Sequence, residues 1–377
     1  MEESRNGRLS SEELKRYHRH FVLPEFGVEG QQKLKNSSVL VVGAGGLGSP
    51  VLLYLAAAGI GHLGIIDFDI IDESNLQRQV LFQTADLGKS KALTAKERLE
   101  KLNPHVNISV FNEKLTTENA LSIIKGFDLV IDGTDNFPTR YLINDACVLC
   151  DKTFIYGSIF RYEGQVAVFN HKGSPHYRDL YPEPPAPEVV PDCEEGGVLG
   201  VLPGIIGSIQ ASEAIKLLTG VGQTLTGKLL LMNLLNLESR IIKIIKQPDL
   251  APIEHLINYD EFCGLTKASR DMVKEITVKE LNELRQQGED FQLIDVREPH
   301  EREIANIEGE LIPLGKIPES LDKIDKNKKV VVYCRSGARS AKAVEYIQRQ
   351  LDIDNLYNLK GGILAWSNEI DPSIPKY

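Results

Sequence analysis

A stretch of 31 residues, from Asn36 to Ile66, contains no Asp, Glu, Lys or Arg. It is long and apolar enough to cross a bilayer, but seven glycines and Pro50 interrupt it. The interruptions leave an apolar run, a glycine-rich turn, a helical run and a second apolar run, in that order. This order is typical of a buried parallel βαβ unit, so we predict such a unit here and no membrane span.

The alternation of strand and helix patterns continues beyond this stretch. Predicted strands lie near residues 38–43, 63–67, 106–111, 127–132 and 153–158. Predicted helices lie near residues 46–58, 89–102, 117–125 and 138–150. Further strands near 164–169, 227–233 and 239–245 flank a predicted helix at 205–218. The pattern predicts an α/β fold with a Rossmann-like doubly wound sheet that is mainly parallel and has antiparallel additions.

Two local features set the ends of the first domain. Ser10 and Glu13 have the spacing of a capping box, which predicts an amphipathic helix from there through Tyr17 and Phe21. The strong periodicity is lost between about residues 247 and 274. We therefore predict a first domain over residues 1–246, a linker over 247–274 and a smaller α/β domain over 275–377. In the second domain we predict helices at 277–287 and 340–350, and strands at 291–295, 329–333 and 355–358.

The composition disfavours two classes of partner. With 43 Lys and Arg against 53 Asp and Glu, the formal net charge is −10, so the chain lacks the basic surface that binds nucleic acid or an anionic membrane. Five cysteines are too few for a disulfide framework, and residues 1–21 lack the apolar core of a signal peptide. We therefore expect a cytoplasmic protein with free thiols.

A glycine-rich motif follows the first predicted strand and opens the first predicted helix. Its glycines, Gly43, Gly45, Gly46 and Gly48, fit the GxGxxG pattern, in which the backbone approaches a phosphate at a helix N-terminus. Asp67 ends the next predicted strand and could hold a ribose hydroxyl. The motif predicts a nucleotide site without saying which nucleotide, so an NAD site stays open at this point.

Charged residues downstream favour a reacting triphosphate over a nicotinamide. Arg78 and Lys91 could neutralise phosphate oxygens and a pyrophosphate leaving group. Asp135 follows the fourth predicted strand, at the sheet edge where such folds bind ligands, and is a candidate Mg²⁺ ligand.

Residues 16–246 resemble the MoeB/ThiF family, relatives of the catalytic domain of ubiquitin-activating enzymes. The resemblance is carried by RYHRHFVLPEFG (16–27), VVGAGGLGSP (41–50), DFDIIDESNLQRQ (67–79), DGTDNFPTR (132–140) and GVLGVLPGIIGSIQASEAIKLLTG (197–220). It implies an enzyme that uses ATP to adenylate the C-terminus of a small ubiquitin-like sulfur carrier. It also implies a homodimer, in which Arg19 reaches the triphosphate of the partner subunit. The residues to which it assigns contacts with ATP and Mg²⁺ are Gly43, Asp67, Asn75, Arg78, Lys91 and Asp135.

Cys193 matches the cysteine that this family places near the adenylate, where it is thought to attack the acyl-adenylate or to accept sulfur. The alternative is a loop cysteine with no role, because Glu194 and Glu195 disfavour a thiolate at this position. We predict a catalytic role for Cys193.

We do not expect a zinc site. Cys147 and Cys150 have a CxxC spacing, but both lie in an apolar helical pattern with no second pair beside them. Many family members carry two CxxC pairs for zinc, whereas here the positions of the first pair read HYRD (176–179) and Cys263 has no partner cysteine nearby. Packing is expected to hold this region instead.

A second site is predicted where an apolar strand runs into a helix at CRSGARS (334–340). Cys334 at this junction would lie among backbone N–H groups near a helix N-terminus, an environment that stabilises an anionic sulfur. Phosphatase loops of the form Cys-x5-Arg need an arginine where this chain has Ser340, so the shorter ring suits a single sulfur atom better than a phosphate. The predicted loop residues are Arg335, Ser336, Gly337, Ala338, Arg339 and Ser340.

Residues 275–377 resemble a rhodanese domain. The landmarks are LIDVREPHE (293–301), the CRSGARS loop and NLKGGILAW (358–366), and they keep Asp295, Arg297 and Cys334 in place. The segment IANIEGELIPL (304–314) departs from the GHIPGAxNIPL-like run that rhodaneses usually have. The resemblance implies a sulfurtransferase, and the alternative is a degenerate rhodanese that serves only as a docking module.

Together these features lead to one hypothesis and two rivals. The hypothesis is adenylation of the C-terminal glycine of a MoaD/ThiS-type carrier that ends in Gly-Gly, followed by sulfur transfer from a Cys334 persulfide to give a thiocarboxylate for molybdopterin or thiamine biosynthesis. A persulfide donor such as a cysteine desulfurase would load Cys334. The rivals are an NAD-dependent oxidoreductase with an appended rhodanese domain and a non-catalytic scaffold that binds the carrier.

Overall fold

The computed structural model describes residues 8–185, 197–264 and 273–377. These residues form two compact units. Of the described residues, the first takes in 8–184 and 197–262, and the second takes in 185, 263, 264 and 273–377. Residues 247–262, which the sequence analysis assigned to the linker, therefore pack with the first unit. Each unit is described by itself below.

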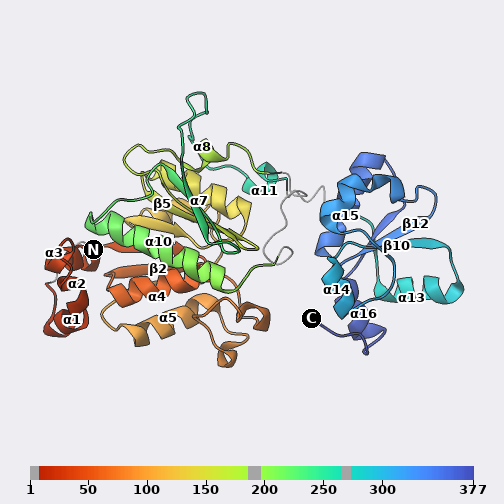
Figure 1. Cartoon of the computed structure of the whole chain (residues 1–377), viewed down its shortest axis with the longest axis horizontal. Helices are drawn as coiled ribbons and strands as arrows, with labels where there is room; N and C mark the ends of the chain where they lie inside the picture. Colours follow the sequence, from red (N-terminus) through yellow and green to blue (C-terminus); the bar gives the residue numbers. More distant parts are fainter. Residues whose placement is uncertain (1–7, 186–196, 265–272) are drawn as a thin grey trace. The chain divides into compact units, whose positions relative to one another are not determined.

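An eight-stranded sheet in the order β3-β2-β1-β4-β5-β6-β7-β8 forms the centre of the first unit (Figure 1). The first five strands of the chain pair in parallel, and the last three add antiparallel pairs. The strands are β1 (Ser38–Val42), β2 (His62–Ile66), β3 (Asn107–Phe111), β4 (Leu129–Asp132), β5 (Thr153–Phe160), β6 (Glu163–Phe169), β7 (Lys228–Asn233) and β8 (Glu238–Lys243). The prediction of a mainly parallel Rossmann-like sheet with antiparallel additions is confirmed.

Ten α-helices accompany this sheet in the described part of the first unit. They are α1 (Ser11–Arg16), α2 (His18–Phe21), α3 (Gly27–Lys35), α4 (Gly48–Ala58), α5 (Lys91–Leu102), α6 (Ala120–Ile124), α7 (Phe137–Leu149), α8 (Tyr177–Leu180), α10 (Val201–Thr219) and α11 (Tyr259–Phe262). Helix α10 is long and apolar enough, by length and composition, to cross a bilayer. It contacts α3, α4, β5 and β6, and residues such as Leu202 and Ile206 belong to the hydrophobic core, so packing accounts for its apolar composition.

The uncharged stretch 36–66 folds as β1, α4 and β2, as predicted. All five residues of β1 are buried, because neighbouring strands flank it on both sides and helices cover it. Gly59 ends α4 in the left-handed conformation (φ +84°), which a residue with a side chain rarely adopts. The chain then turns directly into β2, so the glycine loop and the next strand end are held at the same edge of the sheet.

The prediction of one continuous N-terminal helix is wrong, because two separate helices occupy this segment. The capping box of Ser10 and Glu13 is present, but α1 ends at Arg16 and a separate turn, α2, follows Tyr17. Tyr17 is buried (4% exposed), and its hydroxyl accepts a hydrogen bond of 2.7 Å from the side chain of Asn103. This contact with a residue far along the chain fixes the break between the two helices.

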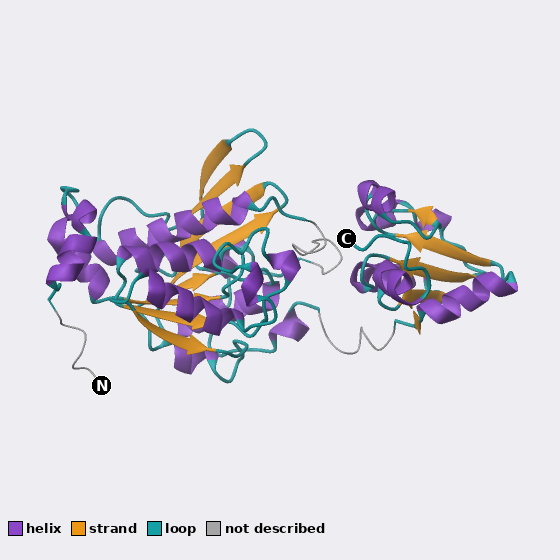
Figure 2. Cartoon of the chain, turned by 90° about the horizontal axis from the view of Figure 1, so that it is seen from below, coloured by secondary structure: helices purple, strands orange, loops and turns teal. Residues whose placement is uncertain are grey.

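The second unit holds a five-stranded, all-parallel sheet between helices (Figure 2). Its order is β11-β10-β12-β13-β9, with β9 (Glu275–Ile276), β10 (Phe291–Asp295), β11 (Glu310–Leu311), β12 (Lys329–Tyr333) and β13 (Leu356–Leu359). The helices are α13 (Val278–Gln287), α14 (Pro299–Ile304), α15 (Ala338–Leu351) and α16 (Gly362–Glu369). Residues of α13 and α16 form one hydrophobic core and residues of α15 form another. Successive residues of β12 alternate between the two cores, as a strand buried on both faces requires.

Of the nine α-helices and strands in the described part of the second unit, four agree with the prediction and five were missed or displaced. Helix α15 begins at Ala338 rather than at residue 340, so the loop after Cys334 is shorter than predicted. The sequence analysis did not predict α14, α16, β9 or β11. These elements are short, the longest having eight residues, and a short segment offers little periodicity to detect.

Candidate active sites

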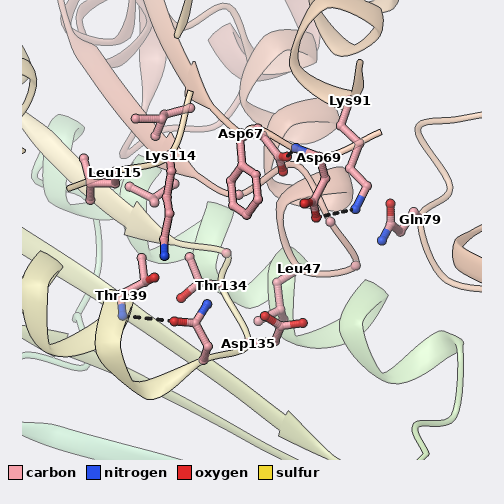
Figure 3. Close-up of a pocket in the computed structure, with 18 of the residues that line it drawn as sticks. Leu47, Asp67, Asp69, Gln79, Lys91, Lys114, Leu115, Thr134, Asp135 and Thr139 are labelled. Carbon is pink, nitrogen blue, oxygen red and sulfur yellow. Dashed lines mark hydrogen bonds and ion pairs between the residues drawn. The ribbon is translucent and has the colours of Figure 1, made fainter. Parts of the chain in front are cut away.

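A pocket in the first unit lies at the carboxyl ends of β1, β2 and β4 (Figure 3). This edge of an open α/β sheet is where such folds bind ligands. The structure brings together around it most of the residues predicted to contact a nucleotide. They are Gly43, Gly45, Gly46, Asp67, Arg78, Lys91 and Asp135.

The glycine loop is fitted closely to its surroundings. A Cβ on Gly43, whose φ is +92°, would lie 2.8 Å from the carbonyl oxygen of Gly133. A Cβ on Gly48 would lie 1.9 Å from the carbonyl oxygen of Gly43. Gly48 does not line the pocket, so its role is to let the loop fold back over the start of α4.

Asp67 ties the glycine loop to the end of β2. Its carboxylate accepts hydrogen bonds from the backbone N–H of Ala44 (2.7 Å) and of Asp69 (2.8 Å). Burial raises the pKa of Asp67 above its ordinary value, although these hydrogen bonds and the charge of Lys91 oppose the shift. The carboxylate therefore shapes the loop as well as lining the pocket.

Lys91 brings a buried cation to the pocket wall. It is the first residue of α5, which Ser90 caps, and its side-chain nitrogen lies 3.0 Å from the carboxylate of Asp69 (Figure 3). Asp69 also lines the pocket and was missed by the sequence analysis, although it stands two residues after Asp67 in the DFD motif. The ion pair with Asp69 holds the ammonium group of Lys91 at the pocket wall, where a phosphate oxygen can also bind it.

The turn 73–79 positions a second cation. Arg78 donates to the carbonyl oxygen of Ser74 (2.9 Å), and its backbone N–H donates to Asn75 (3.1 Å). Asn75 is buried (7% exposed) and does not line the pocket. In this structure Asn75 therefore supports the turn that carries Arg78.

Two carboxylates, one at the last residue of β4 and one just beyond it, have different environments. Asp132 is fully buried and pairs with Arg140 (3.1 Å) and with the hydroxyl of Thr134 (2.5 Å). Burial raises the pKa of Asp132, and the charge of Arg140 opposes that shift. Asp135 is exposed, lines the pocket and forms no ion pair with any residue that the structure describes. Asp135 is thus the carboxylate available to a ligand.

Two further predicted residues lie elsewhere. Arg19 is exposed on α2 and does not line this pocket, so its predicted contact with the triphosphate of a partner subunit stays a prediction. Cys193 lies outside the described residues.

The region that corresponds to the family's zinc site is held by an ion pair and by aromatic rings that pack against it. Asp145 accepts two hydrogen bonds from Arg178 (2.9 and 2.7 Å) and one from the hydroxyl of Tyr259 (2.8 Å). The guanidinium group lies over the rings of Tyr141 (5.2 Å) and Phe262 (4.6 Å). Within residues 8–185, 197–264 and 273–377, no group of three or more His, Cys, Asp or Glu could hold a metal ion.

Cys147 and Cys150 are both in poor positions for thiolate chemistry. Cys147 is fully buried in α7, and burial raises its pKa well above the ordinary value. Cys150 ends α7 and is partly buried, and burial raises its pKa too. Both thiols therefore stay protonated near neutral pH.

Cys334 stands at the end of β12 in the second unit, with 1% of its surface exposed. Its sulfur accepts hydrogen bonds from the backbone N–H of Gly337 (3.1 Å) and from the hydroxyl of Ser340 (3.4 Å). Gly337 has φ +97° and precedes α15, so the thiol sits at a helix N-terminus. A Cβ on Gly362 would lie 2.4 Å from the carbonyl oxygen of Cys334, and one on Gly361 would lie 2.6 Å from the Cβ of Ala365. These close approaches explain the glycine pair of the 358–366 landmark.

Both arginines beside Cys334 already have partners. Arg339 is buried and forms two hydrogen bonds of 2.6 Å with Glu301. The side chain of Arg335 donates to the backbone carbonyl of Tyr377 and lies over its ring. The Tyr377 hydroxyl in turn contacts Glu301 (3.2 Å). Glu301 and Tyr377 were missed by the sequence analysis, which assigned no partners to the two arginines.

Asp295 and Arg297 form a support beneath this loop. Both are fully buried, and two hydrogen bonds of 2.9 and 2.7 Å join them. Arg297 also donates to the carbonyl oxygen of Ala305 (2.9 Å) and to the hydroxyl of Tyr377 (2.6 Å). The pair thereby links the end of β10 to α14 and to the segment that contacts Arg335.

Comparisons with known proteins match both parts of the chain. The model of the ThiF family matches residues 17–252, and that of the rhodanese-like domain matches residues 277–369. The probable adenylyltransferase/sulfurtransferase MoeZ of Mycobacterium tuberculosis is 46% identical, over 98% of this chain and 96% of its own length. The sulfur carrier protein adenylyltransferase of Thermus thermophilus is 49% identical, over 68% of this chain and 99% of its own length. The crystal structure of PaaA has a TM-score of 0.55 and 25% identity, and the match covers 64% of this chain and 76% of PaaA.

These relatives favour an adenylyltransferase and sulfurtransferase over both an NAD-dependent oxidoreductase and a non-catalytic scaffold. The chain is an enzyme of this double class. With a family model that covers more than half of its length and a relative that aligns along nearly all of it, the chain belongs to the ThiF family and carries a C-terminal rhodanese-like domain.

Proposed function

We propose that this enzyme adenylates the C-terminal glycine of a ubiquitin-like sulfur-carrier protein and then transfers sulfur to it from a persulfide on Cys334. The observation that carries the proposal is a single pocket whose wall combines the glycine loop with Lys91 and Asp135. A reacting triphosphate needs such a cation and such a carboxylate, whereas hydride transfer to a nicotinamide needs neither. The name of the Thermus relative supports the choice of substrate.

In the first step, the glycine carboxylate attacks the α-phosphorus of ATP. The bond from this phosphorus to the oxygen that bridges to the β-phosphate breaks, and pyrophosphate leaves with the electron pair. The backbone N–H groups of the glycine loop bind phosphate oxygens, while Arg78 and Lys91 neutralise the leaving pyrophosphate. In a homodimer, Arg19 adds a cation to the site of the partner subunit.

Asp135 is the residue that would hold Mg²⁺. Its exposed carboxylate on the pocket wall suits a hard cation that takes most of its ligands from phosphates and water. The ion supplies charge neutralisation of the triphosphate when bound. Asp132 is not available for this task because Arg140 already occupies it.

In the second step, the terminal sulfur of the Cys334 persulfide attacks the carbonyl carbon of the acyl-adenylate, and AMP leaves. The product is an acyl disulfide on Cys334. A second thiol then attacks the Cys334 sulfur, so that the disulfide bond breaks and the thiocarboxylate leaves. The new disulfide needs an external thiol reductant before the next cycle. We propose that Cys193 is either the second thiol, which attacks the Cys334 sulfur, or a residue that accepts the acyl group from the adenylate.

The two steps belong to different parts of the chain. We propose that residues 1–246, with the segment 247–262 that packs on them, carry out adenylation, and that residues 275–377 carry out sulfur transfer. A persulfide donor such as a cysteine desulfurase loads Cys334. The thiocarboxylate serves the biosynthesis of a sulfur-containing cofactor, molybdopterin or thiamine.

The exchange of labelled pyrophosphate into ATP tests the first step. The full chain is mixed with ATP, Mg²⁺ and a sulfur carrier that ends in Gly-Gly. We expect exchange that depends on the carrier, falls at least about a hundredfold in Asp135→Ala and is unchanged in Cys334→Ala. Binding of NAD together with no exchange for any carrier would overturn the proposal.

A further inference from the structure

Gln79 is a buried polar residue of the nucleotide pocket that the proposed mechanism does not use. It is 3% exposed and lines the pocket. Its side-chain oxygen is buried and accepts no hydrogen bond from any residue in the described part of the chain. Proteins pair almost all of their buried polar atoms, so an unpaired acceptor in the wall of a ligand pocket indicates a donor on the ligand.

The position of Gln79 places this acceptor at one end of the pocket. Its backbone N–H donates to the carbonyl oxygen of Asn75 (2.9 Å), so the turn that carries Arg78 also fixes Gln79. The carboxamide nitrogen lies 3.7 Å from the point where a Cβ on Gly45 would stand. In Figure 3, Gln79 lies on the same side of the pocket as Lys91, away from Lys114 and Leu115. The carboxamide therefore faces the end where the glycine loop and the cation receive phosphates.

The two ends of a carboxamide need different partners. Its nitrogen donates, and a phosphate oxygen can accept from it. Its oxygen needs a donor, and the phosphate chain of ATP offers none. Lys91, a cation of the same wall, already donates to Asp69 (3.0 Å).

The second reactant supplies a donor of the required kind. The carboxylate of the carrier must reach the α-phosphorus, so the last peptide groups of its tail must enter this end of the pocket. Glycine residues carry no side chains that would shield their peptide N–H groups. A glycine tail can therefore bring an N–H group close to a buried acceptor in the pocket wall.

We propose that Gln79 binds the C-terminal tail of the carrier, and that its side-chain oxygen accepts a hydrogen bond from a peptide N–H of the two terminal glycines. This assignment rests on the proposed adenylation of a carrier. It makes Gln79 a residue that selects for a peptide in the pocket, whereas Arg78 and Lys91 act on the triphosphate. The paired oxygen holds the tail while the carboxylate approaches the phosphorus.

The substitution Gln79→Leu keeps the size of the side chain and removes both polar ends. In carrier-dependent pyrophosphate exchange we expect the KM for the carrier to rise about tenfold, while the KM for ATP changes less than about twofold. Gln223→Leu makes the same replacement at an exposed position outside the pocket and should change neither value. A rise in the KM for ATP with no change for the carrier would overturn the assignment, because the carboxamide would then serve the nucleotide or its hydrated metal.

Two semisynthetic carriers test the same contact with the unaltered enzyme. Each is N-methylated at one of the two terminal glycines and so lacks one peptide N–H. With wild-type enzyme, we expect one of them to have a KM about tenfold higher than that of the unmodified carrier. With Gln79→Leu, the same methylated carrier and the unmodified carrier should have equal KM values. If, for both carriers, the effects of N-methylation and of Gln79→Leu on KM were fully additive, the assignment of Gln79 would be overturned and the proposed function would stand. Absence of exchange with wild-type enzyme and the unmodified carrier would overturn the proposed function together with it.

Discussion

Gly48 illustrates how the space around one atom controls the nucleotide pocket. A Cβ there would lie 1.9 Å from the carbonyl oxygen of Gly43, so alanine must displace the glycine loop. We expect Gly48→Ala to weaken ATP binding at least about tenfold, as measured by calorimetry. Gly204→Ala is the matched control, because a Cβ on Gly204 would meet nothing within 4 Å. Equal ATP affinity in Gly48→Ala and wild type would contradict this role.

Glu301 gives a prediction for pH at the same scale. Burial alone raises the pKa of its side chain, but the hydrogen bonds and charge of Arg339 outweigh burial, and the pKa lies below its ordinary value of 4.5. A carboxylate whose pKa is lowered by folding stabilises the protein above its unfolded pKa and loses that contribution as the pH falls through the folded value. Glu301→Gln should therefore lower stability by about 2 kcal/mol at pH 7.

The difference between Glu301→Gln and wild type should shrink below about pH 4.5. Urea unfolding followed by tryptophan fluorescence measures it, since Trp366 is the one tryptophan of the chain and is buried in the second unit. A difference of constant size from pH 7 to pH 3.5 would contradict the ion pair with Arg339 as its cause.

At the scale of elements, an ion pair joins α7, α8 and α11. Asp145 lies on α7, Arg178 on α8 and Tyr259 on α11, and their hydrogen bonds are 2.7–2.9 Å long. The side chain of Asp145 is 2% exposed. Removing one partner leaves a buried charge unpaired, so Asp145→Asn should lower the stability of the first unit by about 3 kcal/mol. The segment 247–262 should become accessible to proteases at the same time.

The exposed pair of Arg240 and Glu238 provides the control for this prediction. Its side chains are 76% and 61% exposed, so Arg240→Met should cost less than about 0.5 kcal/mol. Far-ultraviolet circular dichroism in urea measures both variants. Because the described residues offer no group of metal ligands, treatment with EDTA should leave the wild-type transition in place. A transition that moves with EDTA would contradict stabilisation of this region by the ion pair.

At the scale of the whole molecule, the two units have separate cores. We expect their unfolding transitions to respond to substitutions independently. Asp145→Asn should shift the part of the circular dichroism transition that belongs to the first unit without shifting the fluorescence transition of Trp366. Glu301→Gln should shift the fluorescence transition and leave the first unit's part of the circular dichroism transition in place. One shared transition that moves with either substitution would show that the units unfold as a single body.

The sequence predicted what depends on local periodicity and missed what depends on distant contacts. The βαβ unit of residues 36–66 was found because glycines and apolar runs mark its elements in order. The break at Tyr17 was missed because Asn103 causes it from 86 residues away. The partners of Arg335 and Arg339 were missed for the same reason. Tyr377 is 42 residues from Arg335, and Glu301 is 38 residues from Arg339. The buried oxygen of Gln79 is visible only once the pocket is assembled.

The most direct test of the whole proposal is the intact mass of the carrier after incubation with the full chain, ATP, Mg²⁺, a persulfide donor and a thiol reductant. The proposal predicts a carrier in which one oxygen of the terminal carboxylate is replaced by sulfur. Cys334→Ala should yield no carrier with a terminal thiocarboxylate, although it still supports pyrophosphate exchange. Formation of the thiocarboxylate at the wild-type rate in Cys334→Ala would contradict the proposal that Cys334 transfers sulfur from the persulfide donor to the acyl-adenylate.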